Sequence, residues 1–207
     1  FLSDDDKISD AATDSPNSHM RHNDLVIDIL QNQQGHKEFV YQKIYLPAYT
    51  QTTTASGTDY PDARKQFMEA LQKGSLVVNY AGHGASNSIT HEMLMTTDKA
   101  SQLNMKNLPL WITASCDITR WDSDDESMGE ALLLNDNGGA IALISTVRVV
   151  YAQQNLSLNT AIARCLFKRK ADGTRYRLGD ILMEAKQSLS SDYNKLNFCL
   201  MGDPSMI

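Results

Sequence analysis

The sequence has little of several features that mark particular protein classes. It contains three cysteines in 207 residues, without a CxxC pair or a Cys/His cluster, so neither a fully paired disulfide framework nor a structural zinc site is expected. Basic residues are outnumbered by acidic ones, 19 to 25, which gives a formal net charge of −6. That balance argues against a nucleic-acid partner. No run reaches the roughly 18 apolar residues that a membrane-spanning helix needs.

The ends of the chain also lack familiar signals. It opens on Phe1 to Asp4 without an initiator methionine or a signal-peptide pattern, and it stops on Met201 to Ile207. We therefore expect a fragment of a longer multidomain protein, with its first strand clipped. Its hydrophobic content of 42% and charged content of 21% are typical of a globular domain. We treat residues 1–207 as one domain, since that length suits a single core.

Apolar runs alternate with amphipathic stretches along the chain. This alternation predicts an α/β fold in three α/β/α layers, with a mainly parallel sheet between helices. The expected helices cover residues 20–34, about 61–74, 98–103, 128–134, 156–168 and 178–189. The expected strands cover residues 1–2, 39–46, 76–80, 110–113, 140–145 and 198–201. Residues 4–18 and 50–58 are polar and are expected to be loops.

Two of these strands carry a reactive side chain at their carboxyl end. The run Leu76 to Tyr80 leads to His83 and Gly84, and the run Leu110 to Thr113 leads to Cys116. Ligands of open α/β sheets collect beyond the carboxyl ends of the strands. If the two strands are neighbours, the sheet brings a nucleophilic thiol and an imidazole together, as covalent catalysis by cysteine requires.

A purely structural interpretation of these motifs competes with the catalytic one. A single cysteine at a strand end is most often a small buried apolar residue, and a single Gly-His-Gly is often only a turn. Two such motifs after consecutive buried strands favour catalysis. We then expect Cys116 as nucleophile, His83 as general acid–base, and the backbone N–H groups of Gly84 and Cys116 as an oxyanion hole.

The two motifs, His83-Gly84 and Ala114-Ser115-Cys116, resemble the gingipain family of cysteine peptidases, family C25 of the caspase-like clan. The resemblance covers nearly the whole chain, although this sequence has one more residue between the alanine and the cysteine than the simplest family pattern. It implies a caspase-like sandwich and a Cys-His peptidase that works through an acyl-enzyme. The segment Gly202 to Ser205 resembles the point where the family's peptidase domains lead into a β-sandwich.

Within the family, the chain is most similar to the sortase of the type IX secretion system. The similarity rests on five short segments: 1–5, 19–21, 79–84, 113–117 and 200–205. It implies an enzyme that removes the carboxy-terminal secretion signal of cargo proteins and joins the new end to a surface lipopolysaccharide. The implied partners are that cargo and other secretion-system subunits, at the outer membrane on the cell surface of a Gram-negative bacterium. A secreted endopeptidase and a non-catalytic scaffold of the same fold stay open as alternatives.

The family also uses an acidic residue upstream of the histidine to orient its ring. The resemblance favours Asp24 for this role, with Asp4, Asp5 and Asp6 as competitors. Trp121 and Asp122 are candidates for substrate binding. Cys165 and Cys199 are expected to be structural, His19, His22 and His36 to be exposed, and His91 and Glu92 to be loop residues. We expect no cofactor and no metal, while calcium binding by the acidic run 4–6 stays open.

Overall fold

The computed structural model describes residues 1–5, 18–55, 57–190 and 193–207. A six-stranded sheet, in the order β11-β10-β9-β5-β1-β2, forms its centre. Its strands are β1 (Leu2–Ser3), β2 (Ile44–Tyr45), β5 (Val77–Ala81), β9 (Leu110–Ala114), β10 (Ala142–Thr146) and β11 (Phe198–Met201). All neighbouring pairs are parallel except β10 with β11. The predicted mainly parallel sheet is confirmed.

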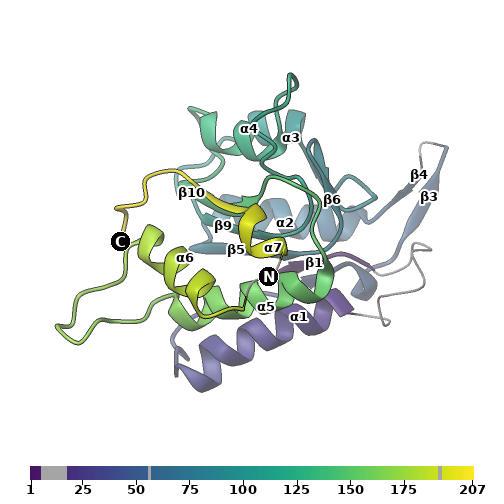
Figure 1. The fold of residues 1–207 in the computed structure, drawn as a ribbon. Coiled ribbons are helices and arrows are strands. Elements are labelled where there is room, and N and C mark those ends of the chain that lie inside the picture. Colours follow the sequence, from purple (N-terminus) through teal and green to yellow (C-terminus); the bar gives the residue numbers. More distant parts are fainter. Residues whose placement is uncertain (6–17, 56, 191–192) are drawn as a thin grey trace.

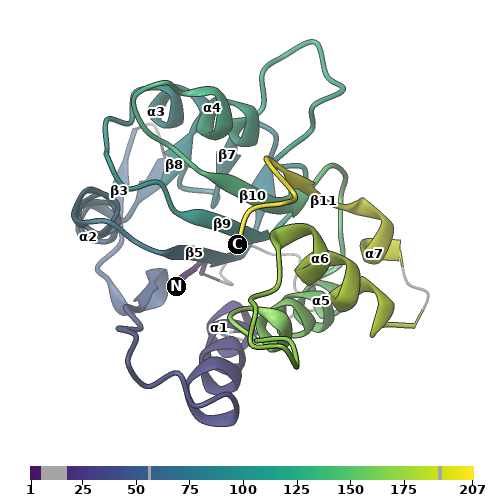
Figure 2. The same cartoon turned by 90° about the vertical axis from the view of Figure 1, so that its left-hand side faces the viewer.

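Helices cover both faces of this sheet (Figures 1 and 2). On one face lie α2 (Pro61–Lys73), α3 (Thr97–Ser101) and α4 (Met128–Leu134); on the other lie α1 (Ser18–Asp28), α5 (Ala152–Cys165) and α6 (Leu178–Gln187). The short helix α7 (Tyr193–Asn197) precedes β11, and a π-helical turn, η1 (Ile29–Gln33), extends α1. The expected three-layer α/β/α sandwich is therefore present.

Side chains of the central strands point alternately to the two faces of the sheet, and each face forms one hydrophobic core with its helices. In β9, Trp111 points into the core shared with α2, α3 and α4, whereas Leu110 and Ile112 point into the core shared with α1, α5 and α6, as the two-residue period of a strand requires. Trp111 is fully buried, and its ring meets Phe67 of α2 edge-on at 5.9 Å. Burial on both faces explains why these strands read as continuous apolar runs.

Local signals set the helix limits. Pro61 begins α2 and Gly74, at φ +94°, follows its end, because proline suits a first turn and glycine tolerates a left-handed conformation. Ser127 caps α4 in a reciprocal capping box with Glu130. The predicted helices 61–74 and 128–134 are confirmed almost to the residue.

Two expectations were wrong. Of the predicted strand 39–46, only β2 forms, because β1 offers just two residues for pairing. Phe39 packs on Phe167 instead, with 4.9 Å between the ring centroids. The predicted loop 50–58 contains a hairpin of β3 (Thr52–Thr54) and β4 (Gly57–Asp59), which suits the threonine-rich sequence.

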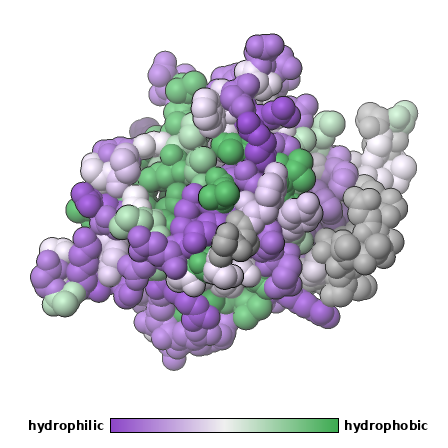
Figure 3. Space-filling model, viewed as in Figure 1, coloured by the Kyte–Doolittle hydropathy of each residue, from purple (hydrophilic) through white to green (hydrophobic). Residues whose placement is uncertain are grey.

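A small second sheet lies between β5 and α3. It consists of β6 (Gly84–Ala85), β7 (Ser88–Ile89) and β8 (Met95–Thr96), all antiparallel, and η2 (Leu46–Ala48) is a short 3-10 turn after β2. Across the described residues, no helix is both long and apolar enough to cross a membrane. The face seen in Figure 3 is largely hydrophilic, with apolar atoms gathered near its centre.

Candidate active site

The pairing of β5 with β9 brings the two motif residues to one edge of the sheet. Ala81 lies opposite Ala114 in the parallel register, and His83 and Cys116 each follow two residues later. The N–H of Gly82 donates to the carbonyl of Ala114 at 3.5 Å. The prediction that these strands are neighbours is confirmed.

The two loops touch at Gly84. A β-carbon placed on Gly84 would lie 3.2 Å from the carbonyl oxygen of Cys116 and 2.7 Å from Cδ1 of Ile118, and it would clash with Oγ of Ser115. Only a residue without a side chain allows this approach of the histidine loop to the cysteine loop. The backbone that carries His83 therefore lies directly against the backbone that carries Cys116.

This contact predicts a large response to a small substitution. Gly84→Ala forces the two loops apart, so we expect about 1–3 kcal/mol of lost stability, the usual range for overpacking, together with lower kcat/KM. Thermal unfolding and peptide hydrolysis measure the two effects. Adding Ser115→Ala to Gly84→Ala removes the nearest obstruction and should restore part of both losses. Full activity of Gly84→Ala would show that the contact does not matter.

The thiol of Cys116 lies half-buried against Val150, which follows β10. Its Sγ lies 3.4 Å from the N–H of Val150 and 3.5 Å from its carbonyl oxygen. Burial raises the pKa of the Cys116 thiol, and this outweighs the lowering by the Val150 N–H. The free protein therefore holds a neutral thiol at pH 7, and a base must take its proton when it reacts.

The raised pKa of the Cys116 thiol predicts how its rate of alkylation depends on pH. A thiol reacts with iodoacetamide as its thiolate, so the rate rises with pH through the pKa of the thiol. For Cys116 we expect the rise to be centred above the value of about 8.5 that is usual for a free cysteine. Mass spectrometry of the modified peptide follows Cys116 separately from the other thiols, with Cys116→Ala as the blank. A rise centred below pH 7 would contradict the assignment.

The turn that presents Cys116 is fixed to the end of β10. Asp117 adopts φ +55°, and its N–H donates to the carbonyl of Arg148 at 3.3 Å. The N–H of Thr119 donates to the carbonyl of Thr146 at 2.9 Å, and the hydroxyl of Thr146 donates to the carbonyl of Ser115. A third parallel strand, β10, thus braces the loop of Cys116.

His83 is held through its backbone. Its N–H donates to Oδ2 of Asp4 at 3.1 Å, and its carbonyl accepts from the hydroxyl of Tyr80 and from the N–H of Thr90. Its ring packs between two other imidazoles, with centroids 5.3 Å from His19 and 4.8 Å from His91. The loop is therefore fastened to the ends of β1 and β5.

The histidines near this loop differ from expectation. His19 and His22, in the first turns of α1, are buried rather than exposed, because that end of the helix packs beneath His83. The sequence gives little indication that these two histidines are buried, since a polar first turn is usual for a solvent-facing helix. His36 is partly exposed and binds Glu38 at 3.1 Å. His91 is an exposed loop residue as predicted, whereas Glu92 beside it is buried.

The carboxylate of Asp24 binds two residues of the segment around β2, and its role in orienting His83 stays a prediction. Its carboxylate accepts from Nζ of Lys43 at 2.7 Å and from the hydroxyl of Tyr45 at 2.8 Å, and it is about half exposed. The acidic residue that binds the loop is Asp4, at the end of β1. Burial and the nearby Glu92 raise the pKa of Asp4 to about 8. Asp6 lies outside the described residues.

The proposed substrate residues lie on the surface beyond Cys116. Trp121 is 57% exposed, and its wall-forming role stays a prediction. The carboxylate of Asp122 forms a two-point pair with Arg148, at 3.0 and 2.6 Å, so a basic substrate group would have to compete with that guanidinium. Val150 was not among the predicted site residues, although the apolar segment after the predicted strand 140–145 was a usable signal.

The two other cysteines lie away from this loop. Cys165 is buried in α5 and Cys199 is partly buried in β11. Cys165 contributes to the core shared with α1 and α6. Both are free thiols, consistent with the structural role expected of them.

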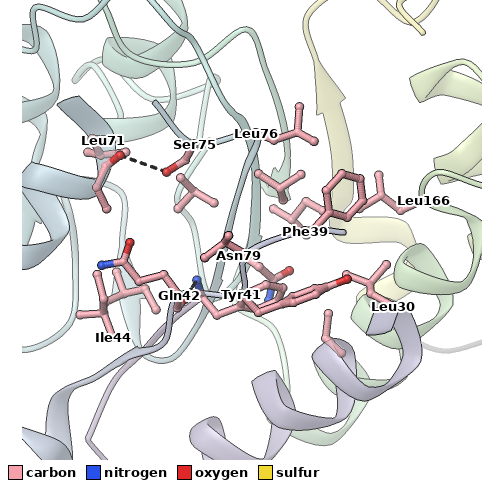
Figure 4. A pocket seen from close by; sticks show the side chains of 18 of the residues that line it. Leu30, Phe39, Tyr41, Gln42, Ile44, Leu71, Ser75, Leu76, Asn79 and Leu166 are labelled. Carbon is pink, nitrogen blue, oxygen red and sulfur yellow. Dashed lines mark hydrogen bonds between the residues drawn. The ribbon is translucent and has the colours of Figure 1, made fainter. Parts of the chain in front are cut away.

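A cavity of about 290 Å³ lies elsewhere, near the start of β5 (Figure 4). Side chains of Leu30, Phe39, Tyr41 and Leu166 surround it, together with Leu76 at the approach to β5. It belongs to the amino-terminal side of the strands, whereas catalytic groups of parallel sheets gather at the carboxyl side. We therefore keep His83 and Cys116, rather than this cavity, as the candidate site.

Comparison with known proteins agrees with the fold. The crystal structure of the Arg-specific cysteine proteinase gingipain R (RgpB) superposes with a TM-score of 0.73 at 19% identity, covering 100% of this chain and 46% of that chain. The complex of Porphyromonas gingivalis RgpB pro- and mature domains gives 0.74 at 18%, covering 99% and 47%. A structure described only as a protease gives 0.58 at 17%, covering 66% and 36%. No curated protein sequence matches.

These likenesses establish a gingipain-like, caspase-like fold, and the chain spans less than half the length of the first two structures. The low sequence identity to these structures does not assign the chain to a family, but a match to a family model does. It matches residues 1–207, the entire sequence. The chain therefore belongs to peptidase family C25.

Proposed function

We propose that the chain is a catalytic cysteine peptidase domain in which Cys116 is the nucleophile and His83 the general acid–base. The observation that carries the proposal is the contact between the two loops at Gly84, which follows from the β5–β9 register. An imidazole and a thiol on touching loops at the carboxyl edge are the groups that acyl transfer needs.

The reaction begins with the neutral thiol held at Val150. His83 takes the proton from Sγ of Cys116, and the thiolate attacks the carbonyl carbon of the scissile peptide bond. The oxyanion of the tetrahedral intermediate accepts hydrogen bonds from the N–H groups of Gly84 and Cys116. His83 then gives its proton to the departing amine, which leaves a thioester on Cys116. Water or an acceptor amine attacks the thioester and restores the thiol.

We further propose that the physiological reaction is the transfer step of type IX secretion, rather than simple hydrolysis. The support is the resemblance of the motif segments, 79–84 and 113–117 above all, to the sortase of that system. In this proposal the substrate is cargo with a carboxy-terminal signal, and the acceptor is an amine on surface lipopolysaccharide. Other secretion subunits are partners, and the place of action is the outer face of the outer membrane.

Intact-mass analysis of cargo separates the candidate functions. Transfer leaves the new carboxyl end as an amide conjugate when acceptor is present, whereas an endopeptidase leaves a free carboxylate under the same conditions. Unprocessed cargo, together with no labelling of Cys116 by a peptidyl chloromethyl ketone, would instead support a non-catalytic scaffold. Cargo incubated with Cys116→Ala gives the background for all three outcomes.

A further inference from the structure

The cavity near the start of β5 lies where the central sheet has a gap between two of its segments. β1 pairs with β5 only at Tyr80 and Ala81, and it pairs with β2 over the same short length. Among the described residues, Val77 to Asn79 have no strand partner on that side of β5, and they line the cavity instead. The cavity therefore reaches both helical layers of the fold.

The walls of this cavity are almost wholly apolar. They are formed by α1, the end of α2, α5 and the segment 39–42 (Figure 4). Among the described residues that line it, none is acidic, and the one basic side chain is Lys73, exposed at the end of α2. Its 290 Å³ is roughly twice the cavity of about 150 Å³ that holds benzene, so about 12 non-hydrogen atoms fit.

Two buried asparagines interrupt this apolar lining. Asn159 of α5 and Asn79 of β5 are each 1% exposed, and both line the cavity. Within the described residues, neither Nδ2 nor Oδ1 of Asn159 has a hydrogen-bond partner, and Oδ1 of Asn79 lacks one as well. Buried amide groups left unpaired destabilise a fold unless something binds them.

The fold explains Asn79 but not Asn159. Nδ2 of Asn79 donates to Oδ1 of Asn23 at 2.7 Å, and Nδ2 of Asn23 donates to the carbonyl of Leu2 at 2.8 Å. Asn79 thus helps to tie β5 to α1 and β1. Asn159 makes no comparable bond to any described residue, so an apolar side chain there would sacrifice no hydrogen bond. Its amide therefore indicates a binding role rather than a stabilising one.

We propose that this cavity binds a small molecule with a neutral primary amide head and an apolar body of about 8–10 carbons. The carbonyl of the ligand accepts from Nδ2 of Asn159, and its N–H donates to Oδ1. Only a head that both donates and accepts satisfies the two atoms. The site lies at the amino-terminal edge of the sheet, so it stands or fails apart from the function proposed for His83 and Cys116.

Calorimetric titration with three probes of one chain length tests the head group. Octanamide offers donors and an acceptor, methyl octanoate offers acceptors alone, and octanoate offers acceptors with a negative charge. We expect octanamide to bind at least roughly tenfold more tightly than the other two, because they leave Oδ1 of Asn159 unpaired or bury a charge. Equal affinities, or a preference for the ester or the anion, would overturn the proposal.

Asn159→Leu separates binding from stability. The affinity for octanamide should fall at least roughly tenfold, while Tm should stay the same or rise, because leucine buries no unpaired amide. Asn104→Leu, in the exposed segment after α3, is the matched control and should keep the affinity. Unchanged affinity in folded Asn159→Leu would contradict the proposal. A lower Tm would contradict it too, because the amide would then serve the fold.

NMR spectra of the unaltered protein decide the matter if Asn159→Leu does not fold. Octanamide should shift the side-chain amide signals of Asn159 and the methyl signals of Leu30 and Leu166, which line the cavity. The methyl signals of Leu132, buried in α4 outside that lining, should not move. If the cavity signals stay unchanged up to the solubility limit of octanamide, the cavity binds no such molecule.

Discussion

Cys116→Ala should reduce peptidase activity by roughly 10⁴–10⁶-fold, the scale seen when a nucleophile of covalent catalysis is removed. The loss should come without unfolding, because Cys116 is only half-buried and other bonds hold its loop. The N–H of Thr119 donates to the carbonyl of Thr146, and the hydroxyl of Thr146 donates to the carbonyl of Ser115. Active enzyme concentration and kcat/KM on a peptide substrate give the activity, and circular dichroism with Tm gives the fold.

The other two cysteines are the matched controls. Cys165→Ala and Cys199→Ala lie in α5 and β11 and should retain activity when folded. Cys165 is buried, so its variant should lose stability rather than kcat. Processing by Cys116→Ala at the wild-type rate would end the peptidase interpretation, whatever the controls show.

His83→Ala should lower kcat/KM by roughly 10²–10⁴-fold, the usual contribution of general acid–base catalysis. The effect is large here because the resting thiol of Cys116 is neutral and needs a base to form the thiolate. Raising the pH should recover part of the loss, since hydroxide then replaces the missing base. A pH–rate profile of variant and wild type measures both effects.

His36→Ala is the control for removal of an imidazole. His36 lies in the turn after α1, bound to Glu38, and its variant should keep the wild-type profile. If His83→Ala matched the wild type at every pH, His83 would have no part in proton transfer. The loops would then adjoin for a structural reason alone.

The placement of the candidate pair, His83 and Cys116, could be predicted from the sequence because it depends on short-range patterns. The apolar runs at Val77 and Leu110 are long enough to mark buried parallel strands, and the residues that follow them must share an edge if the strands pair. Because both strands are buried on both faces, their sequences are continuously apolar and do not alternate with polar residues. His83 and Cys116 then come to the same edge if the two strands are neighbours in the sheet, as consecutive buried strands often are.

The acidic and histidine neighbours could not be read in the same way. Asp4 and Asp5 resemble a solvated run in sequence, yet the parallel pairing of β1 with both β2 and β5 buries them. Asp24 has a favourable spacing from His83, but its place on α1 turns its carboxylate to Lys43. Glu92 is drawn in by the second sheet. Each outcome depends on contacts far apart in the chain, which local pattern does not encode.

The two tryptophans are intrinsic fluorescence probes of two different parts of the molecule. Trp111 is fully buried in the sheet, so its emission should be blue-shifted and insensitive to iodide until the core opens. Trp121 is 57% exposed, five residues after Cys116, so its red-shifted emission should be quenched by iodide and respond when a ligand covers it. One spectrum therefore reports unfolding and occupancy separately, and Trp121→Phe isolates the signal of the interior.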